Sequence, residues 1–166
     1  MMKRALAFIL LALPVYLGIS LAFLDKHYFL CPIEYRTSII IRSDSMGNGE
    51  FGSKRSGNRM HRGVDLLADV GTPVRAVRSG RVRVSTNQPR GMGNYVVVDH
   101  EGNISTLYGH LSEIFVREGD FVRQGQVIGS VGKTGNANHP NMQAHLHFEV
   151  HKDGSAQEPL EYLQYR

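Results

Sequence analysis

The segment 143–150, QAHLHFEV, places two histidines on either side of one leucine. Successive side chains of a β-strand point to opposite faces, so His145, His147 and Glu149 are expected on one face and the apolar residues between them on the other. The apolar face is typical of a strand that packs on a core. Imidazoles that are buried without a partner are costly, so the polar face must be solvated, hydrogen-bonded or bound to something.

A second polar cluster lies in HRGVDLL, where His61 and Asp65 are four residues apart. Residues at this spacing share a face on a strand and on a helix alike, and the alternation of Val64 and Leu66 favours a strand. A straight strand would hold the two side chains about 13 Å apart, too far for one metal ion whose donor atoms lie about 2 Å from it. A bend at Gly63 would allow His61, on a loop, to converge with Asp65, on the strand.

The third cluster is TLYGHL, residues 106–111, in which alternation assigns Thr106, Tyr108 and His110 to one face. Leu107 and Leu111 are assigned to the other face. Tyr108 is expected to pack at the edge of a site or to add a hydrogen bond to it.

These clusters predict one cleft lined by a set of five residues, His61, Asp65, His110, His145 and His147. Three of them would hold a metal ion and the others would handle protons. Three protein ligands and one water are what catalytic zinc requires, and ligation by His and Asp without Cys indicates a hydrolytic site rather than a structural one. Spacing alone does not decide between His145 and His147 as the ligand. The remaining histidines are expected to be ordinary buried or surface residues: His27, His100, His139 and His151.

The elements that would position this cleft are short. Glycine turns separate runs rich in Val and Ile, and the chain contains 18 Gly and 6 Pro, so we expect an all-β fold. Two stretches, GTPVRAVRSGRV at 71–82 and GDFVRQGQVIGSVG at 119–132, repeat the order turn, strand, turn, strand. This doubling predicts a small antiparallel sandwich or barrel of two similar halves. The predicted strands are 38–42, 63–67, 73–76, 80–85, 95–99, 104–111, 121–122, 127–131 and 146–151.

The 166 residues allow one domain with a real core and an N-terminal appendage. Lys3 and Arg4 precede residues 5–24, which carry no charge and match either a signal peptide or a membrane anchor. We favour the anchor, although 20–22 (SLA) offers a cleavage site. Either interpretation places the rest of the chain outside the cytoplasm. The expected organisation is 1–24 as anchor or signal, 25–50 as tether and first strand, and 51–166 as the functional domain.

Composition narrows the function classes. The net charge of +4 is spread along the chain, and no basic cluster interleaved with aromatic residues indicates nucleic-acid binding. The single cysteine, Cys31, cannot form an intramolecular disulfide and lies far from the polar clusters. No serine or cysteine motif offers a nucleophile.

The motifs HRGVDLLADVGTPVRAVRSGRV, TLYGHL, GDFVRQGQVIGSVGKTG and HLHFEV, in this order, resemble those of the lysostaphin-type (LytM-like) zinc endopeptidases that cut peptidoglycan peptides. The resemblance covers residues 51–150. It implies one zinc ion per chain held by His61, Asp65 and His147, with His110 and His145 as the catalytic pair that does not ligate. It also implies an antiparallel β core. The sequence departs from the pattern at 136–143, where extra residues predict a loop beside the cleft.

The expected activity is hydrolysis of a peptide bond in a peptidoglycan stem or cross-link by a metal-activated water, and we favour a D-alanyl cross-link to a diamino acid. The main alternative is a LytM-like domain that has lost catalysis and binds or activates another wall hydrolase. Such domains typically lack ligands, whereas His61, Asp65 and His147 are all present. A phosphocarrier is a third possibility, which an exported location disfavours.

Overall fold

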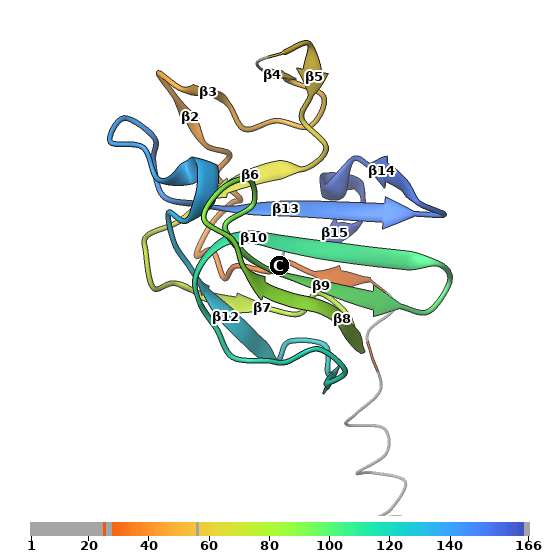
Figure 1. Cartoon of the computed structure of the whole chain (residues 1–166). Coiled ribbons are helices and arrows are strands. Elements are labelled where there is room, and N and C mark those ends of the chain that lie inside the picture. The colour runs from red at the N-terminus through yellow and green to blue at the C-terminus, as the bar shows by residue number, and fades with distance from the viewer. Residues whose placement is uncertain (1–24, 26–27, 56, 165–166) are drawn as a thin grey trace, which may run out of the picture.

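The main feature of the fold is one large sheet of antiparallel strands (Figure 1). The computed structural model describes residue 25, residues 28–55 and residues 57–164. The main path of the large sheet runs β11, β8, β9, β10, β12, β7, and β13 pairs with β10, β14 and β6. The strands of this sheet are β6 (Val64–Leu67), β7 (Pro73–Arg75), β8 (Gly80–Asn87), β9 (Asn94–His100), β10 (Ile104–Ile114), β11 (Phe121–Val122), β12 (Val127–Val131), β13 (His145–Lys152) and β14 (Ser155–Gln157). The β-dominated antiparallel fold expected from the sequence is confirmed.

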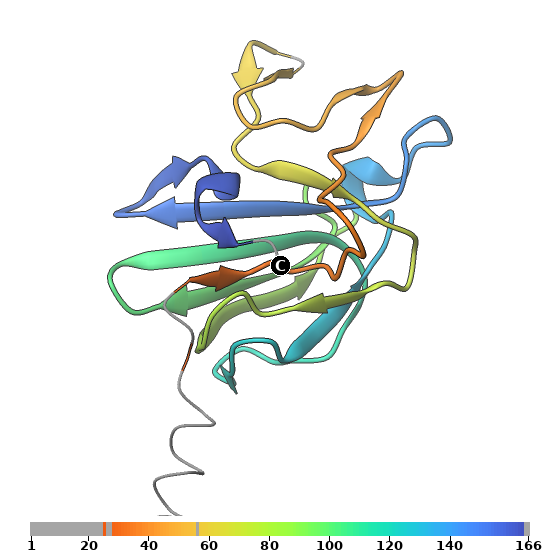
Figure 2. The ribbon, with the colours of Figure 1, turned by 180° about the vertical axis from the view of Figure 1, so that it is seen from behind.

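Smaller elements surround the large sheet. Two hairpins, β2 (Ser43–Asp44) with β3 (Gly47–Asn48) and β4 (Lys54–Arg55) with β5 (Arg59–Met60), project above β6 in Figure 1. Near the two ends of the described chain, β1 (Phe29–Leu30) pairs in parallel with β15 (Leu163–Gln164) across the back of the sheet (Figure 2). The helical elements within the described ranges are two short 3-10 turns, η1 (Gly135–Ala137) and η2 (Pro159–Glu161).

The two stretches that echo each other in sequence pair reciprocally. The first strand of the stretch 71–82, β7, pairs with the second strand of the stretch 119–132, β12. Correspondingly, β8 pairs with β11. Both pairs are antiparallel, so each of the two repeated stretches, 71–82 and 119–132, supplies the pairing partners for the strands of the other. This arrangement agrees with a fold of two similar halves.

The apolar face of β13 fixes the strand in the core. Leu146, Phe148 and Val150 are fully buried in the hydrophobic cluster, as their alternation predicted. A slip of one residue would exchange the two faces of the strand, and burying each such side chain stabilises the fold by about 1.5–3 kcal/mol, so the register is strongly specified. The core therefore determines that His145 and His147 lie on the opposite face.

The expected alternation along β10 is wrong. Thr106 and Tyr108 are fully buried, and Tyr108 and Leu111 belong to the same hydrophobic cluster. The register shifts between Tyr108 and Leu111, and His110 lies between them with a positive φ of 62°. This irregularity is a β-bulge, which re-aims the side chain that it contains. His110 therefore leaves the face of Tyr108, and Tyr108 takes no part in the polar cleft.

A buried polar chain links β9 to β10. His100 Nδ1 lies 2.9 Å from the Ser79 carbonyl oxygen and must donate to it, so a neutral ring accepts at Nε2 from the Thr106 hydroxyl, 2.8 Å away. The Thr106 oxygen lies 3.0 Å from the Tyr108 hydroxyl, which accepts from the Val77 N–H at 3.0 Å. A proton on His100 Nε2 would make His100 donate to Thr106 and Thr106 donate to Tyr108. The buried Tyr108 hydroxyl hydrogen would then have no acceptor in this chain of hydrogen bonds. The chain thus favours neutral His100.

The surroundings of His100 act in the same direction. Burial lowers the pKa of His100, and the positive charge of Arg78 lowers it further. The hydrogen bond to Ser79 and the charges of Asp25 and Asp99 oppose the shift without reversing it. His100 is therefore a structural histidine whose neutral form is favoured by the fold.

The segment before β2 differs from the expectation. Residues 38–42 do not form a strand; Ile41 makes only an isolated antiparallel bridge to Leu66. The expected anchor or signal at 1–24 lies outside the described residues. Among the described residues, no helix combines the length and apolar character needed to cross a bilayer.

Candidate metal centre

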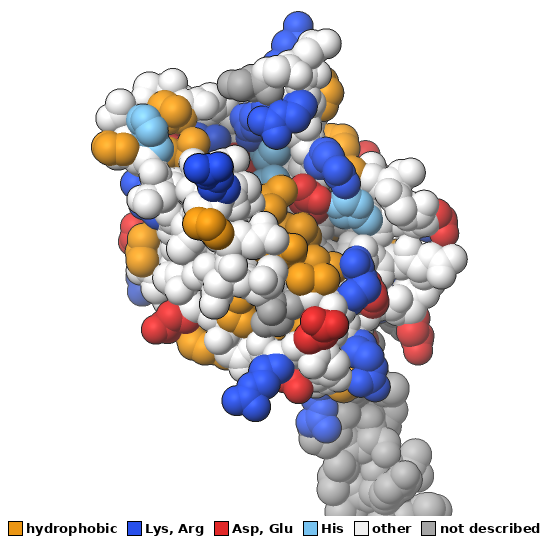
Figure 3. Space-filling view, in the orientation of Figure 1, with side chains coloured by type: hydrophobic (Ala, Val, Ile, Leu, Met, Phe, Trp, Pro, Cys, Tyr) orange, Lys and Arg blue, Asp and Glu red, His pale blue; other side chains and the backbone are white. Residues whose placement is uncertain are grey.

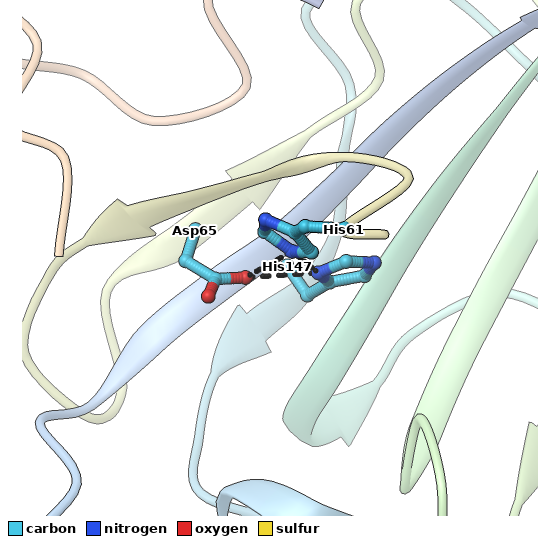
Figure 4. A group of neighbouring side chains, drawn as sticks. All are labelled: His61, Asp65 and His147. Carbon is cyan, nitrogen blue, oxygen red and sulfur yellow. Dashed lines mark hydrogen bonds and ion pairs between the residues drawn. The ribbon is translucent and has the colours of Figure 1, made fainter. Parts of the chain in front are cut away.

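Three side chains from three parts of the chain converge on one point (Figure 4). His61 lies on the loop after β5, Asp65 on β6 and His147 on β13, where the strand register sets Asp65 opposite His147. The His61 Nε2 atom is 3.0 Å from His147 Nδ1, and Asp65 Oδ1 is 3.1 Å from the first and 2.9 Å from the second. All three residues are buried. Within the described residues they form the one group of this kind that could hold a metal ion.

The triangle formed by His61 Nε2, Asp65 Oδ1 and His147 Nδ1, called the donor triangle because these atoms would donate electron pairs to a metal, has dimensions that suit zinc. Tetrahedral zinc bound by nitrogen and carboxylate oxygen at about 2.0–2.1 Å separates neighbouring donors by about 3.3 Å. The three edges measured here are 2.9, 3.0 and 3.1 Å, so each donor needs to move outward by only a few tenths of an ångström. Two imidazoles and one carboxylate also match the ligand types of catalytic zinc sites, in which a fourth position stays open.

Gly63 produces the bend that joins His61 to Asp65. A Cβ atom on this glycine would lie 2.3 Å from the Phe148 carbonyl oxygen and 2.8 Å from Glu149 Cγ. Only a residue without a side chain allows the start of β6 to approach β13 this closely. The bend expected from the spacing is present, and it rests on backbone contact with the strand that carries His147.

Each histidine of the triangle is oriented by its second ring nitrogen. His61 Nδ1 lies 2.8 Å from the Glu50 carbonyl oxygen, so it donates and leaves Nε2 with the lone pair. His147 Nε2 lies 2.9 Å from Glu149 Oε1, which leaves Nδ1 as the ring nitrogen of His147 that can bind a metal. The other oxygen of Glu149 contacts His151 Nε2. Carboxylate and carbonyl partners of this kind fix the tautomer and ring orientation of metal-binding histidines.

Asp65 is held by two arginines on the oxygen that faces away from the histidines. Its Oδ2 accepts from Arg42 Nη2 and Arg55 Nη2, both at 3.0 Å, and from Arg42 Nε at 3.3 Å. Arg42 is only 2% exposed. With Oδ2 occupied, Oδ1 is the oxygen presented to a metal, which favours coordination by a single oxygen.

Electrostatics in the cluster follow from burial and close pairing. Burial would raise the pKa of Asp65, but its close pairing with the His147 and His61 rings holds it far below its ordinary value. Burial would lower the pKa of His147, but its hydrogen bonds to Asp65 and Glu149 raise it to about 9. Glu149 is also buried, and its bonds to His147 and His151 lower its pKa to about 2. Both carboxylates are therefore ionised at neutral pH, and Asp65 presents its negatively charged Oδ1 to a cation.

His110 and His145 lie beside the triangle. Their ring centroids are 5.0 Å apart, and the His110 ring is 5.8 Å from that of His147. His110 Nδ1 is 2.9 Å from the Thr134 carbonyl oxygen, and His145 Nδ1 is 2.7 Å from that of Gln143. Each ring therefore carries its lone pair on Nε2. Burial lowers the pKa of both histidines, that of His110 to about 3, so both rings are neutral.

The structure thus brings together all five residues that the sequence singled out, and it adds others that the sequence reasoning missed. Asp44 and Arg55 lie in the stretch 43–60, rich in Gly, Ser and Asn, where no periodicity marks a buried charge, and Arg42 ends the segment 38–42 that was expected to form a strand. No sequence signal would have identified Arg42 as a buried partner of Asp65. Among the other histidines, His100 lies in the core and His151 contacts Glu149.

Comparison with known proteins identifies the family. Residues 59–159 match the model of peptidase family M23, and this chain belongs to that family. The chain is 41% identical over 102 residues to the DD-carboxypeptidase/endopeptidase Mpg of Neisseria meningitidis, covering 61% of this chain and 22% of the relative. It is 34% identical over 116 residues to the murein hydrolase activator NlpD of Escherichia coli, covering 70% of this chain and 28% of the relative. The chain therefore spans less than a third of the length of either relative.

Solved structures share the fold. The catalytic domain of the antimicrobial peptidase lysostaphin from Staphylococcus simulans aligns with a TM-score of 0.60 at 33% identity, over 68% of this chain and 87% of that chain. A zinc-containing peptidase from Vibrio cholerae aligns with a TM-score of 0.65 at 29% identity, over 80% of this chain and 39% of that chain. The resemblance to lysostaphin-type peptidases inferred from the motifs is confirmed.

Proposed function

We propose that this protein is a zinc-dependent endopeptidase that hydrolyses peptide bonds of peptidoglycan. The observation that carries the proposal is the complete donor triangle of His61, Asp65 and His147, with edges of 2.9–3.1 Å, beside the neutral pair His110 and His145. Membership of a zinc-dependent peptidase family supports the same activity.

In this proposal His61, Asp65 and His147 hold one zinc ion. When bound, zinc acidifies a water molecule to near neutral pKa and polarises the scissile carbonyl. His110 and His145 each present an Nε2 lone pair, because their Nδ1 protons are engaged by backbone carbonyls. One of these rings accepts the proton of the attacking water, and the other assists at the oxyanion or the leaving amine. General acid–base groups of this kind contribute about 10²–10⁴ in rate.

The surface around the site suits an anionic peptide. The β4–β5 hairpin carries Lys54 and Arg59 in addition to Arg55, which is bonded to Asp65, and Figure 3 shows Lys and Arg side chains around a small area of histidine surface in the upper part of the molecule, above a strip of hydrophobic side chains. Peptidoglycan stem peptides carry free carboxylates. Basic groups near a site raise the local concentration of such a substrate.

The preferred bond is a D-alanyl cross-link to a diamino acid. This choice is supported by similarity to Mpg, whose name describes a DD-carboxypeptidase and endopeptidase. A wall substrate also agrees with export, for which we propose residues 1–24 as an anchor or signal, 25–50 as a tether and 51–166 as the catalytic domain. Similarity to the murein hydrolase activator NlpD places a relative in the same peptidoglycan context.

That relative also supports a second candidate function, activation of another wall hydrolase without catalysis. The complete donor triangle favours the enzyme, because a domain that only binds a partner has no need of three converging metal donors and two tautomer-fixed histidines.

The deciding experiment is digestion of purified peptidoglycan by the zinc-loaded protein, with products identified by mass spectrometry. We expect cross-linked dimers to become monomers with intact stem–glycan bonds, and His147→Ala to be inactive. Freed stem peptides would instead indicate an amidase. Absence of products from several wall types, with zinc bound, would overturn the enzyme in favour of the activator.

A further inference from the structure

Asp44 joins two loops at the edge of the metal centre. Its Oδ1 accepts from Arg42 Nη1 at 2.7 Å and from the Met46 N–H at 2.8 Å. Its Oδ2 accepts from the Gln143 N–H at 2.9 Å. The first two partners belong to the β2–β3 region and the third to the loop before β13, which lies beside that hairpin in Figure 1.

Both ends of this link continue into the site. On one side Arg42 donates to Asp65 Oδ2 through Nη2 at 3.0 Å and through Nε at 3.3 Å. On the other side the Gln143 carbonyl oxygen accepts from His145 Nδ1 at 2.7 Å. An unbroken chain of hydrogen bonds therefore runs from Asp65 through Arg42, Asp44 and Gln143 to His145.

We propose that Asp44 is a positioning residue that sets the placement of His145 relative to Asp65. The inference deepens the proposed function and rests on it, because it concerns a metal ligand and a histidine that handles protons. Asp44 touches neither reacting atoms nor metal donors. It acts because one carboxylate binds the guanidinium that holds Asp65 and the backbone that holds His145.

The link is rigid enough for this role. Arg42 is 2% exposed and bonded at both ends to ionised carboxylates, and charge-assisted bonds of this kind are about twice as strong as neutral ones. The backbone reinforces it: Arg42 N–H donates to the Asp65 carbonyl, Asp65 N–H to Gly49, and Gly49 N–H to Arg42, at 2.8–2.9 Å. Asp44 and Arg42 lie outside the segment 59–159 matched by the family model, whereas Asp65, Gln143 and His145 lie inside it, so the link joins the N-terminal region to the matched domain.

The main test is Asp44→Ala in the full zinc-loaded chain, solubilised in detergent. Three measurements are made: kcat and KM on peptidoglycan fragments, the zinc dissociation constant by chelator competition, and the imidazole Nδ1–H proton signal of His145 by NMR. We expect kcat to fall about 10–100-fold with KM within about threefold, because misplacement by about 1 Å costs up to about 10² in rate. The zinc dissociation constant should rise about tenfold, as for other partners of metal ligands. The His145 signal should broaden through faster exchange with solvent.

The matched control is Asp99→Ala. Asp99 also pairs with an arginine, accepting from Arg83 Nε at 2.9 Å on both oxygens, but it lies on β9 with its side chain 46% exposed. All three readouts should match the unmodified protein. Asp44→Asn keeps an acceptor oxygen and should recover part of each readout; it also serves if the alanine variant does not fold.

Unchanged zinc affinity and an unchanged His145 signal in Asp44→Ala would overturn the positioning role, as would equal changes in Asp99→Ala. The proposed function fails separately, if the unmodified zinc-loaded protein leaves peptidoglycan intact. In that case zinc affinity and the NMR signal still decide the role of Asp44, because neither requires turnover.

Discussion

Replacing Gly63 with alanine should separate folding from metal binding. The added Cβ would lie 2.3 Å from the Phe148 carbonyl oxygen, whereas carbon–oxygen contacts across a sheet need about 3.3 Å. The start of β6 must therefore move about 1 Å away from β13. Overpacking of this size typically costs about 1–3 kcal/mol, so the fold should survive with a reduced free energy of unfolding.

The metal centre tolerates a displacement of β6 far less well than the fold does. The donor edges of 2.9–3.1 Å join His61 and Asp65, on either side of Gly63, to His147 on β13. Metal–ligand distances vary by only about 0.2 Å, so a displacement of about 1 Å removes His61 or Asp65 from the ligand set. We expect the zinc dissociation constant to rise by more than about 100-fold, beyond the effect of losing a partner of a ligand.

The assay combines urea unfolding, followed by circular dichroism, with chelator competition for zinc. Gly102→Ala is the matched control: its φ is +81°, so alanine is strained there by about 1–2 kcal/mol, but its Cβ would meet no atom within 4 Å. Gly102→Ala should lose similar stability and keep its zinc affinity. Zinc affinity of Gly63→Ala equal to that of the control would refute the reasoning.

Three further predictions concern single histidines. His147→Ala should abolish tight zinc binding, and unchanged zinc stoichiometry would remove it from the ligand set. His110→Ala and His145→Ala should each keep zinc and lose about 10²–10⁴ in rate; loss of metal in either would make that residue a ligand. His100 has a pKa below 6.5 when folded, so the unfolded chain binds more protons as pH falls through 6.5. Its contribution to stability, present above pH 6.5, should decline below it by up to about 1.4 kcal/mol per pH unit, and His100→Gln should show a flatter dependence in urea unfolding at several pH values.

Much of the site could be predicted because it lies on regular strands. Alternation along 145–150 identified both faces of β13, since the apolar side chains are buried and a slip of one residue would exchange the faces. The even spacing of His61 and Asp65, with a glycine between them, predicted a bend because a straight strand is too long for one ion. These inferences depended only on backbone geometry.

The parts that could not be predicted depend on local irregularity or on distant contacts. Alternation assigned His110 to the face of Tyr108, and the β-bulge with a positive φ at His110 reversed that assignment. Asp44 lies in a loop without periodicity and Arg42 ends the segment 38–42, where the expected strand does not form, so nothing in their neighbourhood marks them as partners of Gln143 and Asp65. Whether a charge in such a segment is buried depends on which strand edge it reaches, which is a tertiary property.

β7 pairs with β12 and β8 pairs with β11, so the two halves of the chain contact each other through equivalent strands, as the two subunits of a symmetric dimer do. Each half supplies one strand to each pair, so neither half can complete its sheet alone. The metal centre is divided in the same way, because His61 and Asp65 precede the turn at Gly102 and His147 follows it. A chain severed at that turn would yield two fragments that regain tight zinc binding only by reassembling. Zinc binding would therefore measure the association of the two fragments.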